Sequence, residues 1–244
     1  MERTYARAAR YALYPNMLGL CGPRGRGKEK LYEYLTLKTK VDDQEARELL
    51  EQFTAATAYM KLIAAANEIP DWLDPRVVDA YWIGNDLLNL VRAEDLKELI
   101  HGLVLAGKLA ESAAEEAIAR VHRDHRPHHS FHVFVIGGLS GQVERGSIGW
   151  ELCRIGWGTV ARVKHDGNLT VLAESLLQKG GKIFPELEGV ERERLIRRDR
   201  ELFPRVSSGD LVAFHWGRVV EIIDHDAARR LDYWTERTLR HCRL

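Results

Sequence analysis

The strongest constraint on the fold is a change in hydrophobic period near Pro127. Before it, apolar residues such as Leu49, Phe53 and Met60 recur every three to four positions, which is the spacing of a buried helical stripe. After it, short segments alternate between the two faces of a strand. The sequence therefore predicts an α+β fold, with an N-terminal all-helical domain, then a small β-barrel, then a C-terminal helix.

Helix boundaries in the first half are marked by capping residues. Asp42 stands three positions before Glu45, as in a capping box, and Asp74 precedes Pro75, a residue well suited to the first helical turn. The stretch from 93 to 121 reads as two short helices that are broken near Gly107. These signals predict a helical bundle or array over residues 1–127.

The second half contains several short strand patterns. "SFHVFVIGG" alternates and predicts a strand, and Asp166-Gly167 predicts a hairpin turn between two further strands. "GVERERLIRRDRELF", which lies within a charged insert around residues 186–203, is too charged for a core strand and predicts an exposed helix. The predicted units are a helical domain over 1–127, a strand with a Gly-rich linker over 128–149, and a barrel domain over 150–244.

Charge and cysteine usage exclude several function classes. Thirty-six Lys and Arg residues balance thirty-six Asp and Glu residues, so we expect neither a nucleic-acid partner nor a membrane surface. The first fifteen residues lack the apolar core of a signal peptide, and no apolar run is long enough to span a bilayer. The three cysteines are odd in number and widely separated. We expect a cytoplasmic protein with reduced thiols.

A motif near the N-terminus resembles a phosphate-binding loop in outline. "GPRGRGK", from Gly22 to Lys28, fits the glycine and lysine spacing, but Glu29 takes the place of the Ser or Thr that binds magnesium. The preceding segment contains Pro15 and makes a poor central strand. We interpret the motif as a flexible basic turn, with nucleotide binding as the minor alternative.

Two segments of the second half carry a family resemblance. "ELCRIGWGTVARV" places Cys153 five residues before Gly158, and "SSGDLVAFHWGRVVEIIDHDAARRL" places His215 after an apolar strand. Together, over residues 150–244, they resemble the small nickel–iron hydrogenase maturation chaperones of the HypC/HupF type, which fold as small OB-like barrels. The positions that follow the family's second motif are Gly209, Asp210, Val212, His215, Gly217, Ile223 and Asp224.

The resemblance implies an iron-handling role. In that family a cysteine and a histidine help to carry the iron centre with its cyanide and carbon monoxide ligands, which implies Cys153 as thiolate and His215 as its companion. The implied partners are a maturation scaffold protein or the hydrogenase large-subunit precursor. Soft thiolate suits such an iron centre on chemical grounds as well. The family's cysteine is N-terminal after removal of Met, whereas Cys153 is internal.

Five of the ten histidines fall within residues 122–134, "HRDHRPHHSFHVF". We expect His122 and His125 to lie in solvent at a helix end, where histidine suits the dipole. His128, His129 and His132 interleave with aromatic residues and could line an interdomain pocket that faces Cys153, in place of the family's terminal amine. The cluster could equally be a hinge. Cys21 could join the same pocket, although a core thiol beside a turn is the alternative interpretation.

We therefore expect an accessory chaperone or adaptor in nickel–iron hydrogenase maturation, with iron as the cofactor, either by itself or as an iron–cyanide–carbonyl unit. The candidate ligands are Cys153, His215, His128, His129, His132 and Cys21. Two alternatives stay open. One is an iron-dependent enzyme that makes or processes a ligand of the iron centre, and the other is a metal-free interaction module.

Overall fold

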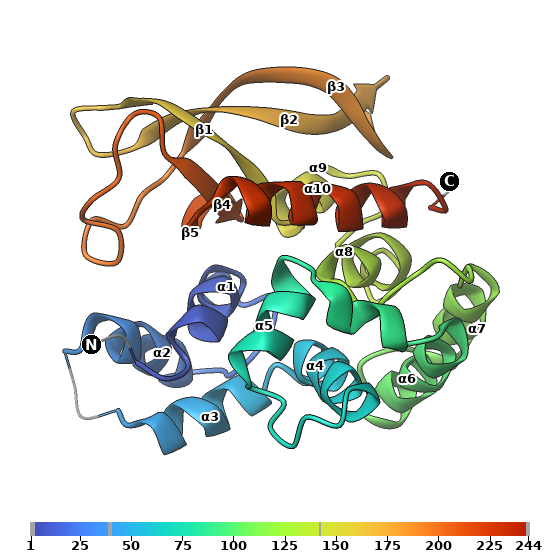
Figure 1. Ribbon diagram of the computed structural model, residues 1–244. Helices are drawn as coiled ribbons and strands as arrows, with labels where there is room; N and C mark the ends of the chain where they lie inside the picture. The colour runs from blue at the N-terminus through green and yellow to red at the C-terminus, as the bar shows by residue number, and fades with distance from the viewer. Residues whose placement is uncertain (1–2, 39–40, 142, 243–244) are drawn as a thin grey trace.

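The computed structural model describes residues 3–38, 41–141 and 143–242. The first half is helical, and Figure 1 shows its helices gathered in a layer below the sheet. Its elements are α1 (Ala6–Met17), α2 (Gly27–Thr36), α3 (Asp43–Glu51), α4 (Thr54–Ala66), α5 (Pro75–Trp82), the 3-10 helix η1 (Asp86–Leu90), α6 (Ala93–Leu105) and α7 (Glu111–Ala119).

The predicted helix boundaries are confirmed by their local contacts. The Asp42 side chain accepts a hydrogen bond from the backbone N–H of Glu45 at the start of α3. Asp74 caps α5, with Pro75 at its first position. The break between α6 and α7 contains Gly107, whose φ of 66° lies in the left-handed region that ends helices.

The second half forms a five-stranded antiparallel sheet in the order β3-β2-β1-β4-β5. Its strands are β1 (Gly156–Val163), β2 (Leu169–Lys179), β3 (Lys182–Ile196), β4 (Leu211–His215) and β5 (Arg218–Ile223), and α10 (His225–Leu239) follows. The predicted turn joins β1 to β2, with Gly167 at φ 88° and Asp166 accepting from the backbone N–H of Asn168. The α+β class is confirmed.

The sheet is open, so the predicted closed barrel is not confirmed. Its edges are β3 and β5, and Arg197, the residue after β3, forms an isolated parallel bridge with Arg218 of β5. There the N–H of Arg197 donates to the carbonyl of Gly217 at 2.9 Å, and the N–H of Val219 donates to the carbonyl of Arg197 at 3.0 Å. The curved sheet encloses a small apolar core of its own that includes Val171.

The strand predicted for "SFHVFVIGG" is wrong, because the segment is helical. Residues His129–Phe131 form α8, and the π-helix η2 continues over His132–Gly137. Its apolar residues from Val133 to Ile136 are buried in succession rather than on alternate sides. A short apolar run that is buried all round gives no period by which strand and helix can be distinguished.

The exposed helix predicted around residues 186–203 is also wrong. Most of this segment belongs to β3, which pairs with β2 along its length. β3 is an edge strand, and its charged residues, such as Glu191 and Arg192, are exposed. Charged side chains are a common protection of sheet edges against pairing with other chains, so high charge did not exclude a strand.

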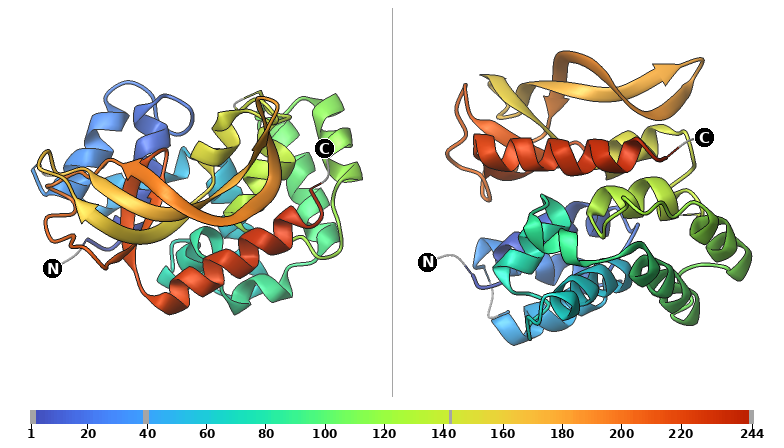
Figure 2. Two further views of the ribbon diagram at one scale, coloured as in Figure 1. Left: turned by 90° about the horizontal axis from the view of Figure 1, so that it is seen from above. Right: turned by 45° about the vertical axis from the view of Figure 1, so that its right-hand side comes forward.

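One hydrophobic cluster extends through both halves of the chain. It contains Tyr11 and Tyr81 from the helical layer together with Ala213, Val220 and Trp234 from the sheet and α10. Figures 1 and 2 show α10 lying between the sheet and the helices. The core at this junction holds the segments that form the candidate site. The division into units at 127 and 149 stays a prediction.

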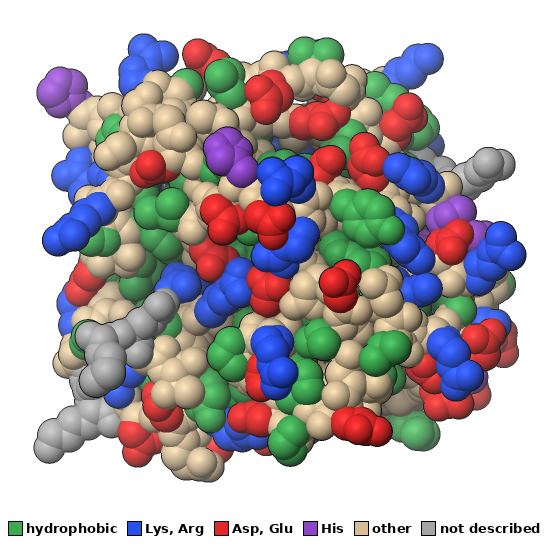
Figure 3. Space-filling model, in the orientation of Figure 1, with side chains coloured by type: hydrophobic (Ala, Val, Ile, Leu, Met, Phe, Trp, Pro, Cys, Tyr) green, Lys and Arg blue, Asp and Glu red, His purple; other side chains and the backbone are tan. Residues whose placement is uncertain are grey.

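The described residues include no helix that is both long and apolar enough to cross a membrane. Figure 3 shows acidic and basic side chains interspersed over one face of the molecule. This mixture agrees with the equal numbers of acidic and basic residues in the sequence.

Candidate metal centre

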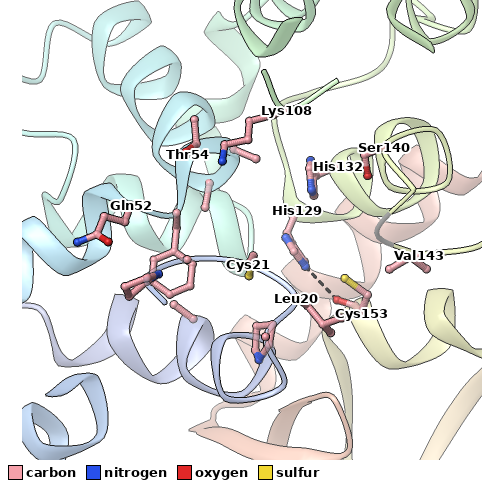
Figure 4. A pocket seen from close by; sticks show the side chains of 18 of the residues that line it. Leu20, Cys21, Gln52, Thr54, Lys108, His129, His132, Ser140, Val143 and Cys153 are labelled. Carbon is pink, nitrogen blue, oxygen red and sulfur yellow. Dashed lines mark hydrogen bonds between the residues drawn. The ribbon is translucent and has the colours of Figure 1, made fainter. Parts of the chain in front are cut away.

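Three potential metal ligands meet at the junction of the two halves. His129 begins α8, Cys153 ends α9 (Ile148–Cys153), and His215 ends β4. One ligand atom from each of the three lies within 4.8 Å of the others. Figure 4 shows His129 and Cys153 side by side at one wall of a pocket. Residues far apart in the sequence are therefore brought into one Cys-His-His group.

The His215 imidazole is held in one tautomer by the helical half. Its Nδ1 lies 2.9 Å from the backbone carbonyl oxygen of Tyr11, and a carbonyl can only accept, so Nδ1 carries the proton. The other ring nitrogen, Nε2, is buried and makes no hydrogen bond. Burial lowers the pKa of His215 to about 4, so the ring is neutral at physiological pH. A neutral imidazole with an unused lone pair is suited to ligate a metal.

The His129 ring has partners on both nitrogens. Its Nε2 donates to the backbone carbonyl of Cys153 at 2.9 Å, and its Nδ1 lies 3.1 Å from the Tyr81 hydroxyl. Burial, with a smaller effect of the nearby His215, lowers the pKa of His129 well below its usual value. If Nε2 bound a metal, it would give up its hydrogen bond to the Cys153 carbonyl. Nδ1 would keep the Tyr81 hydroxyl as its partner.

The Cys153 thiol is protonated in the absence of a cation. Burial, with a smaller effect of the nearby Cys21 thiol, raises its pKa to about 12. A bound metal ion removes the proton of a coordinating thiol, because the thiolate is the form that ligates. A thiol with so high a pKa is a weak nucleophile at neutral pH, so Cys153 suits metal binding better than metal-free nucleophilic chemistry.

A buried ion pair fixes the helix that carries Cys153. Glu151 and Arg154, which are 5% and 1% exposed, flank the cysteine and are paired at 3.0 Å. Glu151 also accepts from the backbone N–H of Leu176 at 2.7 Å and pairs with Arg194. Burial alone would raise the pKa of Glu151, but the two guanidinium groups hold it below the usual value. α9 is thereby anchored to β2 and β3.

The three ligands open onto a cavity of about 490 Å³. Cys21 and His132, two further predicted site residues, also line it. Cys21 faces the same space but lies outside the group of three. The His132 ring centroid is 6.3 Å from that of His129, and its buried Nδ1 has no hydrogen-bond partner. Both side chains therefore border the space that a ligand of the centre would occupy.

His128 does not line this cavity. Its Nδ1 lies 2.7 Å from the Ser130 hydroxyl and accepts from the backbone N–H of Ser130, so the side chain caps α8. Of the three histidines expected to face Cys153, His129 lies beside it.

The expectation that His122 and His125 lie in solvent is wrong for His125, which is 1% exposed and packs edge-on against Phe131. His122 stacks on His241 with ring centroids 3.6 Å apart, and Asp124 completes a second, half-buried group of potential ligands. The C-terminal turn folds back onto this segment. Cys242, close to the C-terminus, packs against an apolar cluster.

Sequence reasoning missed Tyr11 and Tyr81, which hold the two imidazoles. Tyr81 lies on α5 and reads as a core aromatic, and Tyr11 acts through its backbone carbonyl. Neither role leaves a signal in residue spacing. Their contacts with His129 and His215 form only when the helices pack against the sheet.

The comparisons with known proteins place the whole chain in one family. Residues 2–243 match a family model described as "Family of unknown function (DUF6390)". The chain belongs to the DUF6390 family. Neither a curated protein nor a solved structure matches it. Because the DUF6390 match covers the helices as well as the sheet, the residues on both sides of the candidate centre lie within the family unit.

Proposed function

We propose that His129, Cys153 and His215 bind one transition-metal ion, and that the ion is iron. The observation that carries the proposal is the group of three ligand atoms within 4.8 Å of one another. One thiolate and two imidazoles form a soft-to-borderline donor set. Three protein ligands that open onto a cavity leave a coordination position for an exogenous ligand, which distinguishes reactive sites from closed structural sites.

The residues present fit a metal on independent grounds. The buried Nε2 of His215 has no partner, and a buried polar atom normally finds one in the folded, loaded protein. The same donor set also suits zinc. Iron is favoured by the resemblance of the Cys153 and His215 segments to the hydrogenase maturation chaperones.

We further propose that the protein is an accessory chaperone or adaptor in nickel–iron hydrogenase maturation. The cargo would be the iron–cyanide–carbonyl unit, received from a scaffold protein or delivered to the large-subunit precursor. Two facts support this role. The residues implied by the resemblance meet in space, and the adjoining cavity has room for small ligands on the iron. In this proposal the curved sheet corresponds to the small OB-like barrel of those chaperones.

A second candidate function is an iron-dependent enzyme that makes or processes a ligand of the iron centre. The cavity of about 490 Å³ favours it, because this volume can hold a small organic substrate beside the metal. In both functions Cys153 and the two imidazoles hold the iron, so the functions differ in what occupies the cavity.

The test is anaerobic purification from cells that express the hydrogenase maturation proteins. Iron should co-purify with the wild-type protein and should be lost in Cys153→Ser, His129→Ala and His215→Ala. Cys242→Ser and His165→Ala are matched controls outside the pocket and should retain it. Infrared bands of bound cyanide and carbon monoxide support the chaperone role. Iron without these bands supports the enzyme, and equal iron in all variants contradicts the centre.

A further inference from the structure

The mouth of the cavity is strongly basic. Arg24, Lys28 and Lys108 line it, and no Asp or Glu is among its described lining residues. The chain as a whole has equal numbers of acidic and basic residues, so this excess of positive charge is local to the pocket. Within the described part of the chain, none of the three cations forms an ion pair. Their charges are therefore available to a bound molecule.

The basic turn that resembled a phosphate-binding loop forms part of this mouth. Gly22 and Gly25 have φ values of 81° and 59°, and α2 begins at Gly27. The fully buried Asn16 side chain donates to the backbone carbonyls of Cys21 and Pro23 at 2.7 and 2.8 Å. Hydrogen bonds to a buried amide hold this turn in place, so Arg24 extends from a supported loop and Lys28 from the first turn of α2 directly after it.

The two ends of the cavity differ in chemistry. Figure 4 shows Lys108 and Thr54 across the cavity from Cys153 and His129, with Cys21 between them. The inner end offers the thiol and buried ring nitrogens without partners on His132 and His215. A molecule that fills the cavity would therefore meet positive charge at one end and soft or neutral donors at the other.

We propose that the cavity binds a small molecule with a carboxylate or phosphate group, which the three cations at the mouth contact, while its other end reaches the Cys153 centre. The inference rests on the proposed metal centre for the inner contact. Charge-assisted hydrogen bonds from Lys and Arg are the usual recognition of both anionic groups. The volume falls within the range of small-molecule sites.

The test compares two alkylating reagents of similar size on the metal-free protein. Iodoacetate is anionic and iodoacetamide is neutral, and with either one the thiolate displaces iodide to form a carbon–sulfur bond. Cys242 is an internal control, because its pocket is lined by three carboxylates, those of Glu174, Glu186 and Glu236, against the one guanidinium of Arg240. Peptide mass spectrometry should give a higher ratio of iodoacetate to iodoacetamide modification at Cys21 and Cys153 than at Cys242.

Two double variants test the source of the preference. Lys28→Gln/Lys108→Gln removes two charges from the mouth, and Lys179→Gln/Lys182→Gln removes two exposed charges from the β2–β3 hairpin. The first should lower the ratio at the pocket thiols about tenfold, and the second should leave it unchanged. A ratio no higher than at Cys242, or one unaffected by the first variant, overturns the proposal.

Titration calorimetry of the metal-free protein gives an independent readout if the thiols react slowly. The probes are inorganic phosphate and acetate, whose relative affinity separates a phosphate from a carboxylate ligand. Binding by the wild type and the hairpin variant, with loss in the mouth variant, supports the inference. Absence of binding to both probes overturns it. Anion binding without iron binding would reject the proposed function alone, and iron binding without anion binding would reject this inference alone.

Discussion

The imidazole Nδ1 of His215 lies 2.9 Å from the backbone carbonyl oxygen of Tyr11. This contact joins the end of β4 to α1 and selects the tautomer whose Nε2 is available to a metal. The helical half therefore orients a ligand that the sheet provides. His129 of α8 makes a second link between the helices and the cysteine. Its Nδ1 lies near the Tyr81 hydroxyl of α5, and its Nε2 donates to the backbone carbonyl of Cys153.

The first prediction concerns the hydroxyl that holds His129. Tyr81→Phe removes the partner of Nδ1 and should weaken metal binding about 10–100-fold, as loss of an outer hydrogen bond to a ligating histidine does. Competition with a chromophoric chelator measures the affinity. Tyr59→Phe is the matched control, because the buried Tyr59 hydroxyl has no hydrogen-bond partner. Equal affinities in the two variants would show that Tyr81 does not position the ligand.

The second prediction concerns stability in mild acid. Burial lowers the pKa of His125 to about 4, of His128 to about 3 and of His215 to about 4. In the unfolded chain these histidines titrate near ~6.5, so below that pH the unfolded state binds more protons than the folded state. The free energy of unfolding should fall as pH decreases from about 6.5 toward 4, by up to about 1.4 kcal/mol per pH unit for each histidine.

Urea unfolding of the metal-free protein across this pH range measures the slope. His165→Ala is the control, since His165 is exposed in the turn between β1 and β2, and it should leave the slope unchanged. A free energy of unfolding that stays level between neutral pH and pH ~5 would mean that the buried histidines are charged or solvated in the folded protein.

The third prediction concerns the ion pair beside Cys153. Glu151→Ala leaves Arg154 buried without its carboxylate and should lower the free energy of unfolding by about 3–5 kcal/mol. Chemical denaturation measures the loss. Glu111→Ala, at an exposed position at the start of α7, should change stability by less than about 0.5 kcal/mol. Similar values for both variants would contradict a structural role for the pair.

The fourth prediction concerns close backbone approach in the sheet. A Cβ on Gly158 would lie 2.1 Å from the carbonyl oxygen of Leu172 in the neighbouring strand β2. Gly158→Ala should therefore destabilise the protein by about 2 kcal/mol or more. Gly102→Ala, in α6, meets nothing within 4 Å and should stabilise it by up to about 1 kcal/mol. Thermal unfolding with opposite signs for the two variants would confirm both assignments.

Local signals in the sequence predicted much of the fold. The caps at Asp42 and Asp74 and the turn at Asp166-Gly167 depend on a few neighbouring residues, and the structure confirms each of them. The failures occurred where burial overrides local pattern. Residues 129–137 are buried except for the half-buried His132, and β3 is an edge strand whose charge resembles that of an exposed helix.

The candidate site was predictable in part. The family resemblance of two segments implied Cys153 and His215, and the histidines that interleave with aromatic residues suggested His129. The contributions of Tyr11 and Tyr81, and the position of Lys108 at the cavity mouth, depend on how the helices pack against the sheet. No spacing rule connects residues that meet through tertiary contact alone.

The most direct test of the account is the absorption spectrum of the cobalt(II)-loaded protein, because a thiolate ligand gives cobalt a charge-transfer band that imidazole ligands do not. The metal-free wild type, Cys153→Ser and Cys242→Ser are titrated with cobalt(II) under anaerobic conditions. We predict the band in the wild type and in Cys242→Ser, and its loss in Cys153→Ser. A wild-type spectrum without the band, or one that Cys153→Ser retains, would contradict the proposed centre.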